Sequence, residues 1–417
     1  MNEIRNLLIG LELGEETSQL AYYDRRTKNP VSVAVKPGTN LYRFPTVLTR
    51  LREEGKWMIG YEAEHFASEG RGSLVKNLLR ISSRSGFEVD GTYMEGWELL
   101  QVFISGALDM LGVSDPAQLA QGICITVRSL TPNLAAALKR ALRKIGFAAE
   151  KIFIQDGLES FFYYTYSQRP EIWNRTVGLI EFEKNEVTMH CLMENKKTRP
   201  ITVKTRKIGH TWIPADVKKK DAAFAAALTK WLEDQTFSGL FITGEGFGDW
   251  SKRSLDLMCR DGCHVFAGDN LFVRGACYTA LEKTDEPMIR GRVYLGPDMH
   301  RASVGLDVII RDKQQWMPLV SAGENWFDRE TCIDFILDGR SDIMMTTVPM
   351  DGKGGKPWRL VLDGLPKRPD RTTRIRLKAY CTDADTCVVK AEDLGFGEMF
   401  PATHKIWTLK IALGEES

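Results

Sequence analysis

Residues 14–18 carry the side chains whose chemistry decides most about this chain of 417 residues. They read Gly-Glu-Glu-Thr-Ser, follow an apolar run from Leu7 to Leu13, and precede a second strand-like run that begins at Gln19. A turn of this composition between two strands either cradles an anion with its backbone N–H groups or repels it with Glu15 and Glu16. The choice between these two actions decides whether the chain can hold a phosphate group.

Composition excludes several other classes of partner. The 56 basic and 55 acidic residues leave a net charge of +1, which gives no electrostatic case for nucleic acid. No apolar run approaches the roughly 18 residues of a membrane span, so we expect no membrane insertion. The 8 cysteines are scattered, and the close pairs Cys259/Cys263 and Cys381/Cys387 lack a C-x-x-C spacing. We therefore expect reduced thiols in a cytoplasmic protein without a metal site.

The elements that must position the first turn belong to a pattern that begins twice. Strand-like hairpins alternate with helices up to about residue 172, and the same alternation restarts at Arg175. The helix at 132–145 is the clearest, because Thr131 can cap it, Pro132 suits its first turn and Gly146 ends it. This repetition predicts two related α/β halves. The further predicted helices cover 61–69, 94–111, 158–167, 222–233, 249–260 and 271–282, and the predicted strands include 123–127, 151–154, 177–182, 187–192, 240–243 and 264–266.

From Arg290 onward the pattern changes to short alternating runs separated by Gly, Pro, Asp and Asn. No helical period of any length is present in this part of the sequence. Such a pattern predicts an all-β domain, typical of a sandwich. The predicted strands are 303–311, 316–320, 331–337, 344–348, 358–362, 373–380, 386–391 and 404–413.

This order of pieces resembles the DnaK-type, or heat-shock-seventy, chaperones of the actin-like ATPase superfamily. The segment from Ile9 to Ser18 is similar to the family's first phosphate loop, I-G-I-D-L-G-T-T-x-S. Further similarity lies in Pro45 to Ala63, Ile125 to Tyr164, Leu240 to Leu281, Ser303 to Asp307 and Leu360 to Pro366. The resemblance thus covers nearly the whole chain, although each motif is matched only in part.

The resemblance implies a two-lobed α/β actin-like (ribonuclease H-like) ATPase fold followed by an all-β sandwich. Residues 1–172 would form the first lobe and 173–285 a shortened second lobe. Residues 286–298 would be a linker, and 299–417 a domain resembling the chaperone's substrate-binding domain. The short interval between Leu192 and Leu240 implies that a small subdomain is missing or reduced.

In the family, ATP or ADP with Mg binds between the two lobes. The positions that match its phosphate and adenosine loops are Gly14, Thr17, Gly244 and Gly246. The positions that match residues acting on the metal, the water or the nucleotide are Glu12, Lys76, Asp156 and Glu181. Lys76 can equally be a solvated lysine, and Asp156 a helix cap.

The departures from the family pattern are systematic. Glu15 and Glu16 stand where the family has small hydroxyl residues, and a carboxylate about 4 Å from a γ-phosphate would cost on the order of 4 kcal/mol. At the second phosphate loop, residues 181–186 contain no glycine, and Lys184-Asn185 has the form of a plain hairpin turn. We therefore expect a pseudo-ATPase with no bound cofactor and no metal.

The β-domain offers a binding surface of a different kind. Trp316, Phe335 and Met344 fall near the peptide-pocket positions of the chaperones, although alternating strands also bury such residues in a core. The family's helical lid would follow the β-domain, but the sequence ends at Ser417 without one, so we expect weak, unlatched binding of a protein or peptide partner.

Three functional hypotheses follow. The first is a DnaK-like protein with a degenerate nucleotide cleft that acts as a protein-binding or scaffold module. The alternatives are a divergent chaperone that still hydrolyses ATP, and an actin-like assembly scaffold. The segment 351–356 resembles a P-loop but lacks its Ser or Thr and its helix, so we interpret it as a loop. Lys218 to Lys220 are expected at a solvated helix start.

Overall fold

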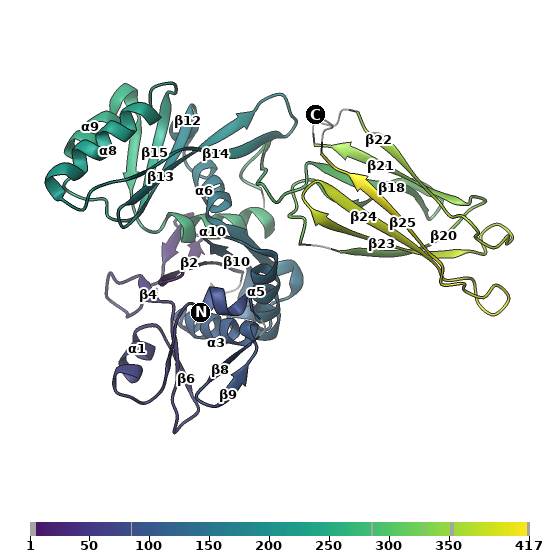
Figure 1. Cartoon of the computed structure of the whole chain (residues 1–417), viewed down its shortest axis with the longest axis horizontal. Coiled ribbons are helices and arrows are strands. Elements are labelled where there is room, and N and C mark those ends of the chain that lie inside the picture. The colour runs from purple at the N-terminus through teal and green to yellow at the C-terminus, as the bar shows by residue number, and fades with distance from the viewer. Residues whose placement is uncertain (1–5, 85, 285–286, 329, 351–353, 415–417) are drawn as a thin grey trace. The chain divides into compact units, whose positions relative to one another are not determined.

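The computed structural model describes residues 6–84, 86–284, 287–328, 330–350 and 354–414 (Figure 1). It divides into two compact units, called unit 1 (residues 1–193 and 205–290) and unit 2 (residues 194–204 and 291–417). The first residue of the predicted linker, 286, and the first half of the P-loop-like segment, 351–353, lie outside the described residues. Within the described part of the chain, no helix is both long enough and apolar enough to span a bilayer.

The first sheet of unit 1 contains the N-terminal hairpin at its centre. Its strand order is β11-β10-β1-β2-β3, with β4 also paired to β2. β1 runs antiparallel to β2 and parallel to β10, which is parallel to β11. The strands are β1 Leu7–Leu13, β2 Thr17–Asp24, β3 Asn29–Ser32, β4 Arg43–Pro45, β10 Ala120–Val127 and β11 Ile152–Asp156.

Helices cover this sheet and share its core. The α5 helix begins and ends as predicted, because Thr131 Oγ1 accepts from the Leu134 N–H and Gly146 takes a φ of +120°. Leu138 of α5 and Phe103 of α3 are fully buried in the same core as Ile9 and Leu11 of β1. The helices are α1 Gly60–Ser68, α2 Leu78–Ser82, α3 Gly96–Asp109, α4 Pro116–Leu119, α5 Pro132–Ile145, η1 Ala149–Lys151, α6 Gly157–Tyr166 and α7 Pro170–Trp173, and the small strands are β5 Leu48–Arg50, β6 Trp57–Ile59, β7 Leu74–Val75, β8 Phe87–Val89 and β9 Thr92–Met94.

The second sheet repeats the arrangement of the first. Its order is β16-β15-β12-β13-β14, with β12 antiparallel to β13 and parallel to β15. The long strand β14 was not predicted, and it occupies part of the interval in which a subdomain was expected to be reduced. The strands are β12 Thr176–Glu183, β13 Glu186–Asn195, β14 Ile201–Trp212, β15 Phe237–Glu245 and β16 His264–Ala267; the helices are α8 Val217–Trp231, α9 Lys252–Met258, η2 Arg260–Gly262 and α10 Leu271–Thr284.

Helices α6 and α10 join the two halves of unit 1 side by side. Ser160 Oγ on α6 donates to the Phe272 carbonyl at 2.6 Å, and Lys283 Nζ on α10 lies 3.2 Å from Glu159 Oε1. Glu159 is buried and the Lys283 side chain is 33% exposed, so the contact connects α10 with a buried carboxylate of α6.

Unit 2 is an all-β structure in which two sheets share one core. The sheet orders are β19-β18-β21-β22 and β20-β23-β24-β25, and Val304 and Ile343 of the first sheet pack in the same cluster as Leu377 and Val389 of the second. All eight predicted strands are present. They are β18 Ala302–Ile310, β19 Lys313–Val320, β20 Thr331–Ile336, β21 Asp342–Pro349, β22 Lys356–Val361, β23 Arg374–Asp383, β24 Thr386–Asp393 and β25 Ile406–Ala412, and a short strand β17 Arg292–Tyr294 pairs with residues 201–203 of β14.

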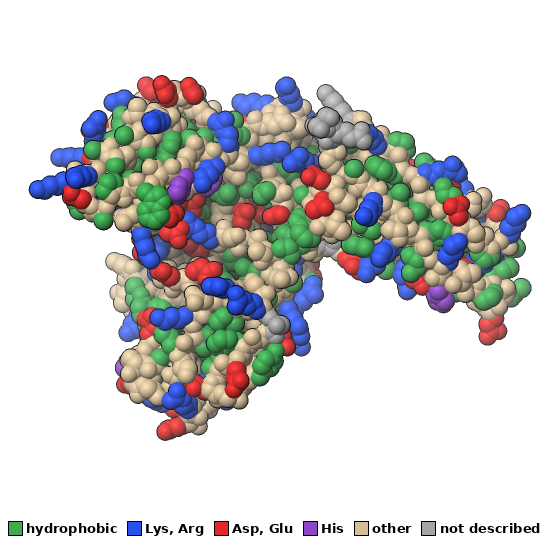
Figure 2. Space-filling model, in the orientation of Figure 1, with side chains coloured by type: hydrophobic (Ala, Val, Ile, Leu, Met, Phe, Trp, Pro, Cys, Tyr) green, Lys and Arg blue, Asp and Glu red, His purple; other side chains and the backbone are tan. Residues whose placement is uncertain are grey.

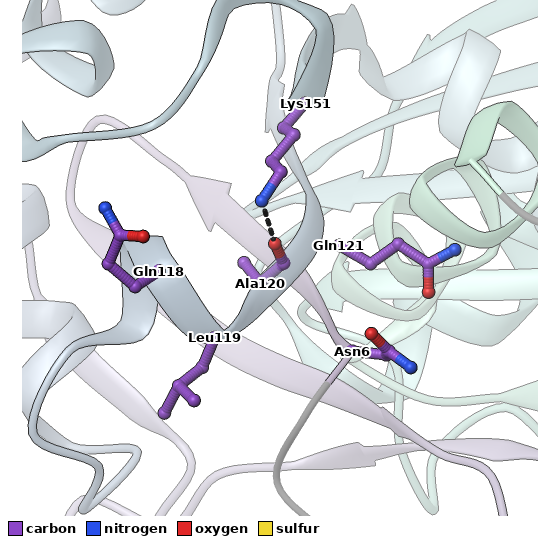
Figure 3. Close-up of a pocket in the computed structure, with 6 residues that line it drawn as sticks. All are labelled: Asn6, Gln118, Leu119, Ala120, Gln121 and Lys151. Atoms are coloured by element: carbon purple, nitrogen blue, oxygen red, sulfur yellow. Dashed lines mark hydrogen bonds between the residues drawn. The ribbon is translucent and has the colours of Figure 1, made fainter.

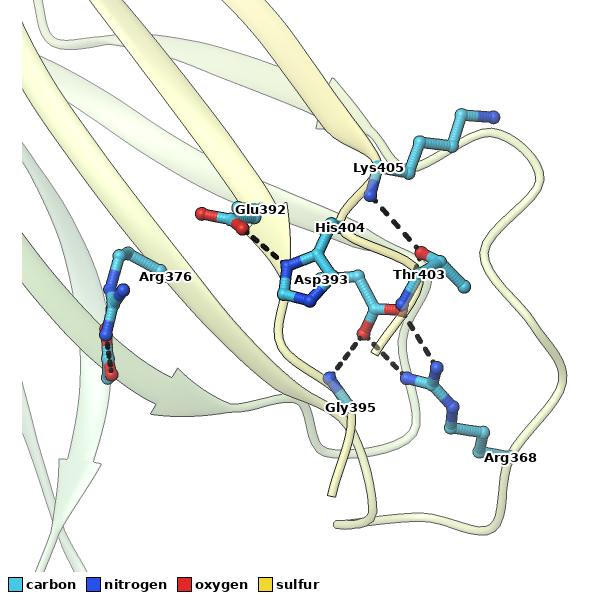
Figure 4. A network of polar contacts seen from close by, with 9 residues as sticks. Arg368, Arg376, Glu392, Asp393, Gly395, Thr403, His404 and Lys405 are labelled. Atoms are coloured by element: carbon cyan, nitrogen blue, oxygen red, sulfur yellow. Dashed lines mark hydrogen bonds and ion pairs between the residues drawn. The ribbon is translucent and has the colours of Figure 1, made fainter. Parts of the chain in front are cut away.

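A buried carboxylate organises the loop between β24 and β25 (Figure 4). The two Asp393 oxygens accept from Arg368 at 2.7 and 2.8 Å, and they also accept from the Gly395 N–H and from Thr403. Asp393 is fully buried and the Arg368 side chain is 5% exposed. This buried ion pair therefore holds the loop between β24 and β25 in place.

Candidate functional site

The first turn, between β1 and β2, uses its own backbone groups to close. The Gly14 N–H donates to the Thr17 carbonyl at 3.1 Å. A Cβ on Gly14 would lie 2.4 Å from that oxygen, so only glycine permits this turn. Glu15 and Glu16 are exposed at its tip. One N–H that an anion would need is therefore already bonded inside the turn.

The second turn, between β12 and β13, is the two-residue hairpin turn that its sequence predicts. Glu183 lies opposite Glu186, and Lys184 adopts a left-handed φ of +59°. The Lys184 Nζ lies 3.6 Å from Glu16 Oε1 of the first turn. The tips of the two turns therefore approach each other, and an ion pair stands between them.

Gly244 and Gly246 give β15 a close approach to this second turn. A Cβ at Gly244 would lie 2.0 Å from the Phe182 carbonyl oxygen, and one at Gly246 would lie 2.6 Å from that of Lys184. The Gly246 carbonyl accepts from Trp250 Nε1 at 2.9 Å and from Lys220 Nζ at 3.1 Å. These contacts account for both glycines through backbone packing. Lys220 was expected to be solvated, but its Nζ instead donates to this backbone carbonyl.

Glu12, on β1, is the most perturbed acid of unit 1. Its Oε2 is buried and has no hydrogen-bond partner among the described residues. Burial raises the pKa of Glu12 to about 7, although Arg43 and the Val273 N–H lower it, while Asp269 and Glu181 add to the increase. Glu181, on the second sheet, is thus close enough to Glu12 to act on its ionisation.

Glu181 already has partners of its own. Arg128, just after β10, lies 3.8 Å from Glu181 Oε1 and 3.1 Å from Glu183 Oε2. His190 Nδ1 lies 3.4 Å from Glu181 Oε2. Arg128, at the edge of the first sheet, thus pairs with both carboxylates of β12, and the His190 ring lies beside one of them.

Arg43, on β4, connects the first hairpin with the second sheet. Its guanidinium lies 3.8 Å from Asp269 Oδ1 and 3.9 Å from Glu245 Oε1, and it donates to the Asp269 carbonyl at 3.3 Å. Sequence reasoning did not single out Arg43 or Arg128. Arg128 directly follows strand β10, and Arg43 begins strand β4. Their positions at strand ends were the only signal in the sequence that pointed to either residue.

Three further residues of unit 1 were predicted as site residues. Lys76 is exposed between β7 and α2. Asp156 caps α6 by accepting from the Glu159 N–H at 2.7 Å, as one of its two interpretations required. Thr17 begins β2 opposite Pro45.

Carboxylates and their ion pairs crowd the two turns that match the family's phosphate loops. No group of three or more His, Cys, Asp or Glu side chains within the described ranges could hold a metal ion. Four glutamates surround the two turns where phosphates would lie, and ion pairs from Lys184 and Arg128 already engage two of them. Figure 2 shows acidic and basic side chains interspersed on the visible surface of unit 1. The arrangement suits an ion-paired contact better than anion capture.

A separate pocket of unit 1 encloses about 470 Å³ at the start of β10 (Figure 3). Its lining includes Asn6, Gln121 and Lys151, and Lys151 Nζ donates to the Ala120 carbonyl at 2.8 Å. Ala120 and Val127 are the two ends of β10, separated by roughly 23 Å at the rise of a strand. The pocket is therefore remote from the turns.

The three residues predicted to bind peptide are divided between the sheets of unit 2. Phe335, on β20, packs against the core, as its alternative interpretation expected. Trp316 and Met344 are 38% and 41% exposed on the other sheet. Ile309 and Val361, at 69% and 42%, were not predicted as site residues but are also exposed there.

These observations define a protein with a repeated α/β unit and an all-β unit that exposes apolar side chains. Residues 29–297 match the C-terminal model of a family of unknown function, DUF5716. This match spans more than half of the chain, so the chain belongs to the DUF5716 family. Residues 299–413 match a domain of unknown function, DUF8552. No curated protein matches the chain.

Proposed function

We propose that this chain is a divergent relative of the DnaK-type chaperones, within the actin-like ATPase superfamily, that binds a protein or peptide segment without hydrolysing ATP. The repeated strand order of the two sheets and the all-β unit that follows them support this relationship. The eight cysteines are free, which supports a cytoplasmic location.

The observation that carries the proposal is an exposed apolar row on one sheet of unit 2. Trp316 lies opposite Asp307, Gly305 opposite Thr346, and Met344 opposite Arg359. Opposite residues share a face, and so do alternate residues along one strand. The residues Ile309, Trp316, Met344 and Val361 therefore occupy one outer face, which we call the apolar row.

The geometry around Trp316 supports recognition of an apolar segment. A Cβ on Gly305 would lie 2.5 Å from the indole ring, so this glycine allows the ring to lie against the sheet. The four apolar side chains come from four adjacent strands, and Asp307 and Arg359 lie between them on the same face. Several large apolar side chains exposed on one face of a sheet support an interaction site there. We assign it to an extended segment rich in large apolar residues.

The contacts around the two turns of unit 1 support the loss of ATPase activity. Lys184, Arg128 and Arg43 each pair with a glutamate or aspartate near the turns. A nucleotide would have to displace these pairs and place its phosphates beside carboxylates. Each such carboxylate would cost on the order of 4 kcal/mol at 4 Å, which is comparable with millimolar binding.

Binding to the apolar row is tested by fluorescence anisotropy of a short labelled peptide rich in leucine. We expect saturable binding, and about tenfold weaker binding for Met344→Glu, because a charge would be buried against the peptide. Met399→Glu is the matched control, since Met399 is 85% exposed in the loop after β24. A peptide with serine in place of leucine should not bind. Equal affinity of the Met344→Glu and Met399→Glu variants would exclude the apolar row as the site.

A working ATPase is the second candidate, and one observation favours it. Glu12 Oε2 lacks a hydrogen-bond partner among the described residues and lies near Glu181, as a cation-binding carboxylate would. This candidate predicts phosphate release that is lost in Glu12→Ala and in Lys76→Ala. Release that is unchanged in both variants would indicate a contaminating ATPase.

A further inference from the structure

A second group of reactive side chains lies in unit 2, in a region that the proposed function does not use. Cys381 on β23 and Cys387 on β24 are directly opposite each other in the register of the two antiparallel strands. Opposite residues point to the same face, and both thiols face the core, with Cys381 9% exposed and Cys387 fully buried. Neither forms a disulfide.

The positions of these two cysteines permit a direct bond. Residues opposite each other on antiparallel strands have Cα atoms about 4.5 to 5.5 Å apart. This separation lies within the range of about 4.4 to 6.8 Å that disulfides span. The register also breaks just after Cys381, between Cys381 and Asp383, so the backbone there departs from a regular ladder.

A buried histidine completes the group. His300 is 3% exposed, and its backbone is held by hydrogen bonds to Glu324 and Gly323. Its Nδ1–H donates to the Ala384 carbonyl at 3.2 Å, so the other ring nitrogen, Nε2, is available to the Cys381 thiol, with which His300 forms a hydrogen bond. The bond to Ala384 fixes the tautomer in which Nε2 lacks a proton, so Nε2 can accept the thiol proton of Cys381.

From this geometry we infer that Cys381, Cys387 and His300 form a peroxide-sensitive dithiol, in which Cys381 reacts first and Cys387 then closes a disulfide across the two strands. Cys381 is the attacking residue because it is the more exposed thiol and the one that His300 contacts. The oxidant is a small hydroperoxide, since little of Cys381 is exposed to solvent.

One molecule of hydrogen peroxide oxidises the two thiols. The Cys381 thiolate attacks one oxygen of hydrogen peroxide, the O–O bond breaks, and the leaving hydroxide takes a proton to become water. Cys381 is then a sulfenic acid. The Cys387 sulfur attacks the sulfenic sulfur, the S–O bond breaks, and the hydroxide leaves as a second water with the Cys387 proton. Two thiols are oxidised to one disulfide, and the peroxide is reduced to two waters.

The pKa values of the two thiols also favour Cys381 as the attacking residue. The hydrogen bond from Cys387 and, against burial, the one from His300 lower the pKa of Cys381 to about 6. The hydrogen bond to Cys381 and burial raise the pKa of Cys387. The other charged groups that act on the pair are Asp383, which raises the pKa of Cys381, and Glu324, which raises that of His300. These effects favour the thiolate at Cys381 over the thiolate at Cys387.

The test treats the full chain with hydrogen peroxide at pH 7 and maps its thiols by mass spectrometry. We expect an intramolecular Cys381–Cys387 disulfide to form faster than oxidation of the exposed Cys332, which serves as the internal control. In Cys387→Ser, reaction should stop at a Cys381 sulfenic acid that dimedone traps. In Cys332→Ser, disulfide formation should be unchanged.

The role of His300 has its own readout. His300→Asn should slow oxidation of Cys381 at pH 7 at least about tenfold and shift the midpoint of its pH profile upward, because less thiolate is present. In the unaltered chain, the pH profile of Cys381 alkylation by iodoacetamide gives the same midpoint without any substitution. Slower oxidation of Cys381 than of Cys332, or a peroxide-treated chain without this disulfide, would overturn the inference.

Discussion

Glu12 is a carboxylate of unit 1 whose ionisation becomes harder on folding. Burial raises its pKa to about 7 against the opposing effect of Arg43. Its oxygen Oε2 has no hydrogen-bond partner among the described residues, so the ionised form is poorly compensated. Ionised Glu12 therefore lowers the stability of the folded chain.

The sign of this effect can be tested with Glu12→Gln. Between the unfolded pKa near 4.5 and the folded pKa near 7, the native state binds the extra proton, so stability falls as pH rises. Glu12→Gln removes this dependence, and we expect it to be more stable than the unaltered chain by up to about 3 kcal/mol at pH 8, with a much smaller difference at pH 5. Thermal unfolding at the two pH values measures the difference. Glu15→Gln, at an exposed position, is the control, and an equal effect of Glu12→Gln at both pH values would contradict the assignment.

The sequence indicated Glu12 and Glu181 as neighbours only through a family resemblance. It could not indicate Arg128 as the counterion of Glu181, because the two residues belong to different halves of unit 1. Partners so far apart in sequence are set by how the two sheets pack, which local patterns do not encode. The plain interpretations of Asp156 as a cap and of Phe335 as a core residue needed only local patterns, and the structure agrees with both.

At the scale of elements, the end of β15 depends on glycine. Gly244 has a φ of +91°, and a Cβ there would meet the Phe182 carbonyl oxygen at 2.0 Å. We expect Gly244→Ala to destabilise the chain by well over about 1 kcal/mol, since the backbone conformation and the contact are both incompatible with a side chain. Gly248→Ala should have little effect, because its nearest neighbour is a Trp250 ring atom at 3.9 Å. Equal urea midpoints for the two variants would refute this explanation of the loop.

The β24–β25 loop depends on a buried ion pair. Removing the Asp393 charge leaves Arg368 buried without its partner, and we expect Asp393→Asn to cost about 3 kcal/mol. Asp338→Asn breaks a similar two-bond pair with Arg371 at the surface and should cost less than about 1 kcal/mol. Comparing the two variants in urea unfolding separates burial from charge pairing. Similar losses would show that burial of the pair is unimportant.

The pH dependence of this pair has the opposite sign to that of Glu12. Burial opposes ionisation of Asp393, but hydrogen bonds from Arg368, Gly395 and Thr403 outweigh it and hold its pKa below the ordinary value. The stability that the pair provides is therefore complete above the unfolded pKa, near 3.8, and is lost only as the pH falls below it. At neutral pH, Asp393→Asn should thus show its full effect.

Most individual elements were predictable because their signals are local. The helix 132–145 carries its own cap and stop residues, and the eight strands of unit 2 carry their alternation and turns. Strand β14 was missed because Lys204, Arg206 and Lys207 interrupt the alternation with exposed charges. Its place in the sheet depends on pairing with β13, which its own composition does not reveal.

At the scale of the whole molecule, one strand order occurs twice in the sheets of unit 1, and an all-β unit follows. The turns that would hold phosphates in a DnaK-type ATPase instead carry glutamates paired with Lys184, Arg128 and Arg43. The surface that remains for a partner is the apolar row of unit 2. We therefore propose that the protein binds its partner without a nucleotide cycle.

The most direct test is a calorimetric titration of the full chain with ATP and magnesium. Because carboxylates occupy the positions of the phosphate loops, we expect no saturable heat up to about 1 mM nucleotide. The same preparation should bind the leucine-rich peptide, which shows that the protein is folded and active in binding. Saturable ATP binding with a micromolar Kd would contradict the proposal of a nucleotide-independent binding protein.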